Sequence, residues 1–249
     1  MRVVRTALTL GFLALPALAG AQSGLVPPPS WAAGDLVCAP FLTYALPNDS
    51  LRVIGSEDTV VKQMMGPGDT LVVSGGSQQG LQGGQEFFVR RLVRTYGQLG
   101  PSRTSPLSVH TAARIRIVGV GAEFSTATVT SACEGILLDD YLEPYEAPVV
   151  AETPIDGEPQ FGGYGRVLVG DQSRLTGGTG DFMMIDLGSD HGIRRGQLFS
   201  VFRDKLDGAG PLVEIGTVEA VSVRPNSSTV QIRSARDAVR QDDLVAIRR

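Results

Sequence analysis

One sequence pattern occurs twice in this chain of 249 residues, and the repeat limits the folds that the chain can adopt. Residues 68–91 align without a gap to residues 180–203, with ten of 24 positions identical. Residues 113–142 align in the same order to residues 216–245, with eight of 30 positions identical. Because both blocks recur in the same order, we expect two homologous modules that each bury a core of their own.

The repeated blocks have the two-residue periodicity of β-strands. In residues 125–130 the apolar Ala127 and Val129 alternate with polar residues, and the second copy alternates in the same way. The alternation shifts directly after Ile117 and, in the second copy, directly after Ala220. A shift kept in both copies predicts a β-bulge or a strand buried on both faces, as in a sheet that curls into a barrel. On the core face we expect Leu71, Val73, Phe87 and Val89 in the first copy, and Met183, Ile185, Phe199 and Val201 in the second.

Glycines and acids recur at the ends of the expected strands. The chain has 31 glycines and 15 prolines, which favours many turns over long helices. Glycine supplies the positive φ that tight turns need, and a neighbouring aspartate can accept backbone N–H bonds within the turn. We therefore interpret the shared acids as turn residues rather than metal ligands, and we expect no metal site. The turn motif comprises Gly68, Asp69, Gly80 and Gly84 in the first copy and Gly180, Asp181, Gly192 and Gly196 in the second, with Gly76 and Gly188 expected in the same role.

These patterns predict an all-β chain with about five to seven short strands in each module. Residues 134–138 and 237–241 are each expected to form one helical turn. The expected architecture is two tandem homologous modules, each a small β-barrel or sandwich, at residues 22–143 and 166–249. Residues 144–165 contain four prolines and predict an extended, semi-rigid Pro-rich linker between the modules.

The N-terminus has the pattern of an export signal peptide. Arg2 and Arg5 precede an apolar run at residues 7–18, and residues 19–21 supply the small side chains that signal peptidase needs. The apolar run is too short for a membrane span of roughly 20 residues, so cleavage of residues 1–21 is favoured over a retained membrane anchor, and we expect no span afterwards. The mature chain is therefore expected in the periplasm or outside the cell.

The two cysteines, Cys38 and Cys133, are expected to form a structural disulfide. Export would place them in an oxidising compartment, and no CxxC spacing points to a redox or metal site, which is the alternative. Cys133 aligns with Arg236 in the second copy. The bond would therefore belong to the first module alone.

Charge and motif content exclude several classes of function. The formal net charge is −4 and no run of basic residues occurs, which argues against a nucleic-acid partner. The chain has no GxSxG motif and only two histidines: His110, expected in a polar loop without a counterpart in the second copy, and His191, expected in a turn. The glycine-rich residues 176–180 precede an expected strand rather than a helix, so they do not predict a phosphate cradle. We expect no catalytic residues and no cofactor.

The largest difference between the copies is a longer connection in the first one. Residues 92–112 separate the two aligned blocks there, whereas residues 204–215 do so in the second copy, which is nine residues shorter. Loops on rigid β scaffolds often carry recognition. The insertion is therefore either a recognition loop, with Thr95, Tyr96 and Arg103 as candidate contacts, or a surface insertion without a binding role.

The spacing G-x-x-x-G-x-x-x-G-Q-x-F occurs at residues 76–87 and again at residues 188–199. With the surrounding sequence, this pattern resembles β-modules of bacterial envelope proteins. It is most similar to the C-terminal domain of the flagellar T-ring assembly protein and, more distantly, to the β-region beside LysM modules. The resemblance implies no catalytic residues. Because the chain has no LysM motif, the resemblance does not by itself imply peptidoglycan binding.

Together these observations favour an exported, non-enzymatic β-repeat protein that binds envelope proteins or cell-wall components. One alternative is a structural subunit of an envelope assembly that associates through exposed strand edges. A less favoured alternative is a hydrolase that uses surface acids such as Asp139 and Asp140. Both acids recur as Asp242 and Asp243, which fits a role in turns better than a role in catalysis.

Overall fold

A computed structural model describes residues 36–45, 47, 51–94, 106–151, 153–204 and 210–249 of the chain. The described residues are nearly all β and contain no helix of seven or more residues. All of them lie within one compact unit, Trp31–Arg249. The expected signal at residues 1–21 and the candidate loop contacts Thr95, Tyr96 and Arg103 lie outside the described residues.

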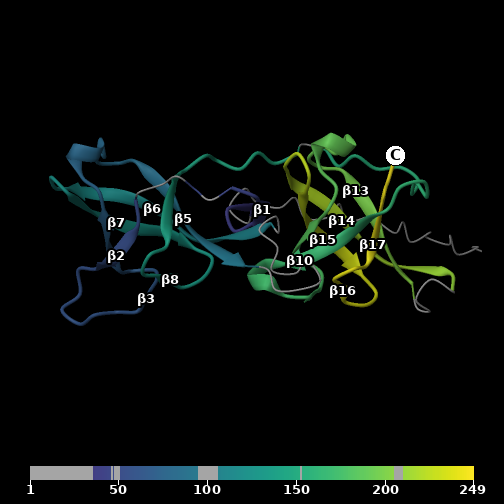
Figure 1. Ribbon diagram of the computed structural model, residues 1–249, viewed down its shortest axis with the longest axis horizontal. Coiled ribbons are helices and arrows are strands. Elements are labelled where there is room, and N and C mark those ends of the chain that lie inside the picture. Colours follow the sequence, from purple (N-terminus) through teal and green to yellow (C-terminus); the bar gives the residue numbers. More distant parts are fainter. Residues whose placement is uncertain (1–35, 46, 48–50, 95–105, 152, 205–209) are drawn as a thin grey trace, which may run out of the picture. The chain divides into compact units, whose positions relative to one another are not determined.

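The first half of this unit forms one seven-stranded sheet (Figure 1). Its order is β2-β4-β7-β6-β5-β9, and β1 pairs with β6. The edge strands β2 and β9 approach each other, since Arg52 bridges to Tyr141 and the Val53 N–H donates to the Asp140 carbonyl at 2.9 Å. The bounds are β1 Phe41–Thr43, β2 Val53–Ser56, β4 Thr70–Ser74, β5 Glu86–Arg94, β6 Leu107–Val120, β7 Phe124–Ala132 and β9 Tyr141–Pro144.

The second half forms a closed barrel of six strands in the order β10-β12-β15-β14-β13-β17. A two-stranded ribbon accompanies each half: β3 (Met64–Met65) with β8 (Ile136–Leu137), and β11 (Thr176–Gly177) with β16 (Val239–Arg240). The three 3-10 turns are η1 Ser77–Gln79, η2 Asp171–Ser173 and η3 Ser189–His191. The barrel bounds are β10 Gly165–Gly170, β12 Phe182–Ile185, β13 Leu198–Asp204, β14 Leu212–Val223, β15 Ser228–Ala235 and β17 Leu244–Ile247.

The expected helical turns at residues 134–138 and 237–241 are wrong, because both segments contain the short strands β8 and β16. Each strand pairs antiparallel with a strand from earlier in the chain, a long-range partner that local sequence does not reveal. These ribbons are one reason why the number of strands, β1 to β9 and β10 to β17, exceeds the expected tally.

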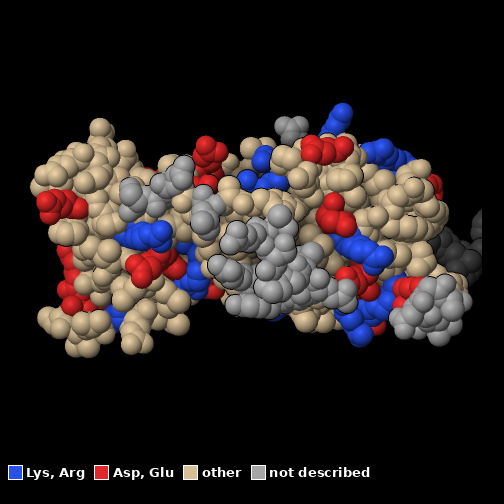
Figure 2. Space-filling model, viewed as in Figure 1, with Lys and Arg blue, Asp and Glu red and all other residues tan. Residues whose placement is uncertain are grey.

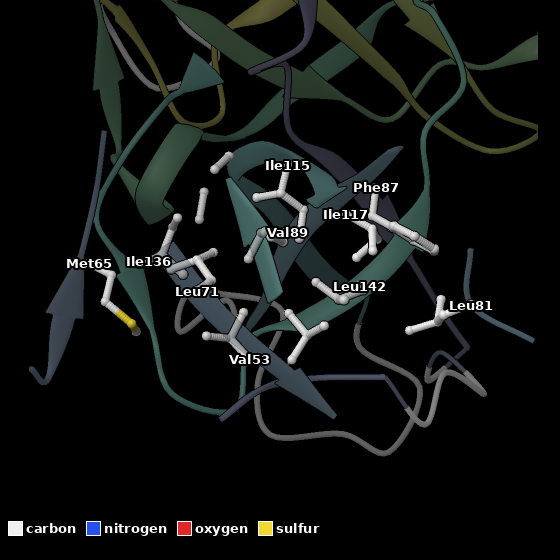
Figure 3. Close-up of a cluster of buried hydrophobic side chains, with 14 residues drawn as sticks. Val53, Met65, Leu71, Leu81, Phe87, Val89, Ile115, Ile117, Ile136 and Leu142 are labelled. Atoms are coloured by element: carbon white, nitrogen blue, oxygen red, sulfur yellow. The ribbon is translucent and has the colours of Figure 1, made fainter. Parts of the chain in front are cut away.

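The core faces are those that the sequence alternation predicts, and Figure 3 shows the cluster in the first half. Phe87 and Val89 of β5 lie in one buried cluster, and Phe199 and Val201 of β13 lie in another. The predicted β-bulge is confirmed in both halves. The register of β6 against β7 shifts between Ile117 and Gly119, and that of β14 against β15 shifts between Ala220 and Ser222. Val118, at the first shift, is turned outward and 57% exposed.

Part of the linker pairs with the barrel, a contact that its prolines do not predict. Pro144 is the last residue of β9 and Gly165 the first of β10, and the part that pairs with the barrel lies between them. The Ile155 N–H donates to the Gly196 carbonyl at 2.7 Å, and the Ile155 carbonyl accepts from the Leu198 N–H at 2.9 Å. Proline removes only its own N–H, so the neighbouring residues still pair with the barrel edge.

The inserted connection is also different from the expected polar loop. β5 continues to Arg94 and β6 begins at Leu107, so both ends of residues 92–112 are strand. β6 is thereby long enough to pair with β5 and β1 at the same end. This extension brings His110 into a strand.

Candidate binding site between the two sheets

The glycines and acids of the shared turn motif lie in turns. Gly68, Gly80, Gly84, Gly180, Gly192 and Gly196 all have positive φ. Asp69 accepts from the Gly66 N–H at 2.9 Å, and Asp181 accepts from the Gly178 N–H at 2.8 Å. His191 lies in turn η3, where its Nδ1 accepts from the Gly188 N–H at 3.2 Å. These side chains satisfy backbone groups of the scaffold.

Gly76 and Gly188 are conserved between the copies for a different reason from the expected one. Their φ angles, −144° and −136°, are extended, so no left-handed conformation requires glycine. A Cβ at Gly76 would lie 2.4 Å from the Gly121 carbonyl oxygen, and one at Gly188 would lie 2.2 Å from the Arg224 carbonyl oxygen. Each glycine allows two backbone segments to approach closely.

Asp140 is buried, which corrects its description as a surface acid, whereas Asp139 is exposed as expected. The counterpart of Asp140 in the second copy, Asp243, is buried as well. Each carboxylate accepts two hydrogen bonds from one arginine, Arg91 or Arg203, at 2.7–2.8 Å. Each also accepts a backbone N–H, from Leu137 at 2.8 Å or Arg240 at 2.6 Å. The pair therefore organises the turn before the last strand in both halves. Arg91 and Arg203 occupy aligned positions in the two copies. The sequence repeat could therefore have identified this arginine as the partner of each aspartate.

The predicted disulfide between Cys38 and Cys133 is present. It joins the segment before β1 to the residue after β7, with a Cα–Cα distance of 5.5 Å. Such a bond fits a protein outside the cytoplasm, where thiols are oxidised. It also fixes the segment that forms one wall of the pocket described next.

A pocket of about 360 Å³ lies where the first sheet meets the barrel. Its walls come from five separate parts of the chain: the segment around Cys38, β5, the start of the linker, the turn before β13 and the β14–β15 hairpin. The polar lining includes three arginines in a chain of net negative charge. Ionisable residues in the lining are Arg90, Arg195 and Arg224 together with Glu143 and Glu146.

Two of these arginines stack on Phe41 of β1. The guanidinium carbon of Arg224 lies 3.7 Å from the Phe41 ring centroid, and that of Arg90 lies 5.0 Å from it. Arg90 also lies 4.0 Å from the Phe88 ring centroid. A guanidinium packs well on an aromatic face because it is planar and weakly hydrated. Phe41 therefore holds both guanidinium groups in place.

The two stacked arginines differ in how their charge is balanced. Arg90 is only 8% exposed, donates to Thr111 Oγ1 at 2.7 Å and lies 2.7 Å from a Glu143 carboxylate oxygen. The Glu143 contact is an ion pair without hydrogen-bond alignment at Nε. Among the described residues, Arg224 forms no ion pair and no side-chain hydrogen bond. Burial lowers the pKa of both guanidinium groups, and the charge on Glu143 opposes this effect.

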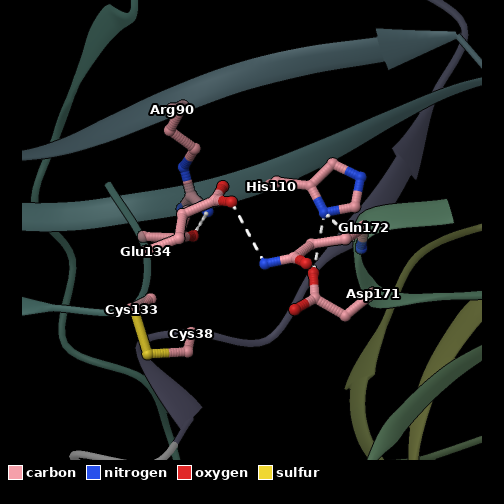
Figure 4. Close-up of a disulfide and its surroundings, with 8 residues drawn as sticks. Cys38, Arg90, His110, Cys133, Glu134, Asp171 and Gln172 are labelled. Atoms are coloured by element: carbon pink, nitrogen blue, oxygen red, sulfur yellow. Dashed lines mark hydrogen bonds and ion pairs between the residues drawn. A yellow bond between two sulfur atoms is a disulfide. The ribbon is translucent and has the colours of Figure 1, made fainter. Parts of the chain in front are cut away.

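A buried polar network lies in the surroundings of the disulfide (Figure 4). His110 of β6 is 1% exposed, and its Nδ1 lies 2.7 Å from the Asp171 carboxylate in turn η2. The Gln172 N–H also points at Nδ1, at 3.0 Å, and the ring can donate to Asp171 or accept from Gln172 but not both through one nitrogen. Nε2 lies 2.9 Å from the Ser108 hydroxyl. The expectation of a loop histidine is wrong, since the inserted connection extends β6 through this position.

The contacts of Ser108, His110 and Asp171 follow the order found in serine hydrolases. Ser108 is 0% exposed, however, and its hydroxyl contacts Met184 Sδ at 3.9 Å. A substrate cannot reach a nucleophile in that position. The network instead joins β6 of the first sheet to the η2 turn of the barrel, and Gln172 extends it to Glu134 at 3.2 Å.

Other chemical features of the described residues are limited. No group of three or more His, Cys, Asp or Glu side chains in the described ranges could hold a metal ion. Within those same ranges no helix is long and apolar enough to cross a membrane. Acidic and basic side chains are interspersed on the face shown in Figure 2. Comparison with known proteins finds no family model that matches this chain and no curated protein that matches it.

Proposed function

We propose that the chain is an exported, non-enzymatic β-repeat protein that binds an envelope protein or cell-wall component in the pocket between its two sheets. The observation that carries the proposal is Arg224, a stacked guanidinium without an acidic partner among the described residues, in a pocket of about 360 Å³. Pockets that bind small molecules typically measure about 300–1,000 Å³. The Arg224 guanidinium makes no hydrogen bond and no ion pair within the described ranges, so its N–H groups are available to a ligand.

The proposed location and architecture rest on separate support. The export signal favours the periplasm or the outside of the cell, and the disulfide is compatible with either. The tandem arrangement is supported by the strand order, since β2 to β9 and β10 to β17 follow each other in the same sequence of sheet and ribbon strands. The proposed modules differ at the pocket. Arg90 aligns with Phe202, and Phe88 aligns with Ser200.

Capture from native envelopes tests the binding function. The mature chain and two variants are crosslinked to envelope material and analysed by mass spectrometry, and each is also sedimented with purified peptidoglycan. Arg224→Gln should lose the captured component, whereas Arg166→Gln, an exposed arginine outside the pocket lining, should retain it. Equal capture by wild type and Arg224→Gln, or no specific capture by any form, would count against the proposal.

A second candidate function is a structural subunit that associates with further copies of the same chain. The β6–β7 hairpin carries Val118, Val120 and Phe124, which are 57%, 38% and 54% exposed. The aligned residue Val221 in β14 lines the pocket at the first sheet, and Val223 packs against the barrel core. The β6–β7 hairpin is thus exposed, whereas the equivalent part of β14 packs against other parts of the chain.

Sedimentation velocity at increasing concentration tests this second function. Self-association should raise the sedimentation coefficient of the mature chain, and Phe124→Asp should abolish the increase. A monomer at every concentration, or association that Phe124→Asp leaves unchanged, would exclude the assembly through this hairpin.

A further inference from the structure

We infer that the pocket between the sheets binds the carboxylate end of a peptide with small aliphatic side chains. The inference rests on the proposed binding function and specifies its ligand. Peptide carboxylates occur both at the C-termini of envelope proteins and on the stem peptides of cell walls, and either source presents the same chemistry.

The charge of the lining favours one negative charge on the ligand. The Arg90 and Glu143 side chains form an ion pair and offset each other. Arg195, Arg224 and Glu146 then leave one positive charge in excess. A carboxylate matches this excess, whereas a phosphate monoester carries about two negative charges at neutral pH.

The donors are arranged for a small planar anion. Ser222 is the second-last residue of β14, and Arg224 directly follows the strand. Both line the pocket. A guanidinium presents two parallel N–H groups that match the two oxygens of a carboxylate. The Phe41 ring, 3.7 Å away, fixes the plane of the Arg224 guanidinium in advance, which lowers the entropy cost of binding.

The remaining wall is aliphatic and its side chains are short. It is formed by residues on both sides of the disulfide, by the start of the linker and by β14. A peptide end with alanine- or valine-sized side chains would bury methyl groups against this wall. The aliphatic residues are Leu36, Val37, Ala39, Ala147, Val149 and Val221.

Titration of the ¹⁵N-labelled mature chain with N-acetyl-Ala-Ala tests the carboxylate directly. The free acid should shift the amide signals of residues 222–224. The C-terminal amide of the same peptide, and methyl phosphate, should bind at least about tenfold more weakly, the factor that corresponds to 1.4 kcal/mol. Equal binding of acid and amide would overturn the inference, as would tighter binding of methyl phosphate or the absence of any shift.

Two variants and one control assign the effect to the pocket. Arg224→Gln and Arg195→Gln should each weaken binding of the acid, and Arg166→Gln should not. The ¹⁵N spectra report whether each variant is folded. Acid binding that survives in both pocket variants would overturn the inference.

The two sources are separated by competition for the labelled chain. Peptidoglycan should compete only before an amidase cleaves off its stem peptides and the freed peptides are washed away, and a peptide matching an envelope protein's C-terminus should compete as the free acid but not as the C-terminal amide. If envelope capture depends on Arg224 while acid and amide peptides bind equally, the proposed function stands and the carboxylate inference fails.

Discussion

Arg91 donates two hydrogen bonds to Asp140, from Nε to Oδ1 at 2.8 Å and from Nη2 to Oδ2 at 2.7 Å. Asp140 belongs to a turn 49 residues further along the chain, so the pair ties the turn before β9 to strand β5. Hydrogen bonding to Asp140 raises the pKa of Arg91. The pair between Arg203 and Asp243 repeats the geometry in the barrel.

Asp243→Asn should destabilise the protein by about 3 kcal/mol, because it leaves the largely buried Arg203 without its main counter-charge. Asp237 provides an internal control, since its carboxylate also contacts the same arginine, at 2.7 Å from Arg203 Nη1. The Asp237 side chain is 51% exposed, whereas that of Asp243 is 4% exposed. Asp237→Asn should therefore lower the free energy of unfolding much less than Asp243→Asn does. Urea unfolding measures both, and equal losses would contradict the assignment.

The same reasoning applies to the acids considered for hydrolysis. The double substitution of Asp139 and Asp140 by alanine should lower the free energy of unfolding, since Asp140 holds Arg91 and Asp139 has a positive φ of 66°. A variant of unchanged stability that loses an esterase or peptidase activity of the wild type would favour the hydrolase alternative instead.

Loss of the disulfide should lower the free energy of unfolding at least as much as Asp243→Asn does. Cys38 and Cys133 are 95 residues apart in sequence, and in the chain-entropy model a loop of that length stabilises by about 4–5 kcal/mol. The double variant Cys38→Ser/Cys133→Ser should show this loss of stability in urea unfolding. The wild type should show the same loss of stability in the presence of a reductant. Because Cys38 anchors the segment that carries Val37 and Ala39, the variant should also lose pocket binding. Unchanged stability under reductant would contradict the expected role.

The sequence was sufficient for features that depend on local periodicity. The core faces around Phe87 and Phe199 follow from two-residue alternation, and the bulges follow from the shift after Ile117 and Ala220. The pocket depends on contacts between distant segments, which periodicity cannot report. Most of its residues that fall in the aligned blocks differ between the copies, so a comparison that looks for shared residues does not find them. Arg90, which aligns with Phe202, is the clearest such signal.

Glu134 lies at the junction between the first sheet and the barrel, where it accepts a hydrogen bond from Gln172. Its carboxyl group should make the free energy of unfolding depend on pH. Burial raises the pKa of Glu134 above its ordinary 4.5, and the charge of Arg91 opposes this effect. Well below 4.5 the carboxyl is protonated in both folded and unfolded chains. As pH rises above 4.5, the unfolded chain loses the proton first, so the folded state loses relative stability until the pH passes the raised pKa.

Glu134→Gln removes the titrating group while keeping an oxygen that can accept from Gln172 Nε2. The variant should gain stability relative to the wild type as pH rises above 4.5, measured by urea unfolding at a series of pH values. Glu123→Gln, at an exposed position away from the junction, is the control and should follow the wild-type profile. A constant difference between Glu134→Gln and the wild type at all pH values would contradict the prediction.

Gly188→Ala should reduce both stability and pocket binding. Its Cβ would lie 2.2 Å from the Arg224 carbonyl oxygen, and backbone atoms in a turn cannot yield as a flexible side chain can. The displacement would break the bond from the Ser189 N–H to that oxygen, now 2.9 Å, and would move Arg224 off Phe41. Overpacking of this kind costs about 1–3 kcal/mol.

Gly76→Ala separates the two effects, because it makes the equivalent clash with the Gly121 carbonyl in the first sheet, outside the pocket lining. It should lower stability by a similar amount and leave binding intact. Gly83→Ala meets nothing within 4 Å and should alter neither property. Urea unfolding and titration with an envelope-derived ligand measure the two properties independently. If Gly76→Ala weakened binding as much as Gly188→Ala, the loss would reflect general destabilisation, and the close approach at Arg224 would have no specific part in shaping the pocket.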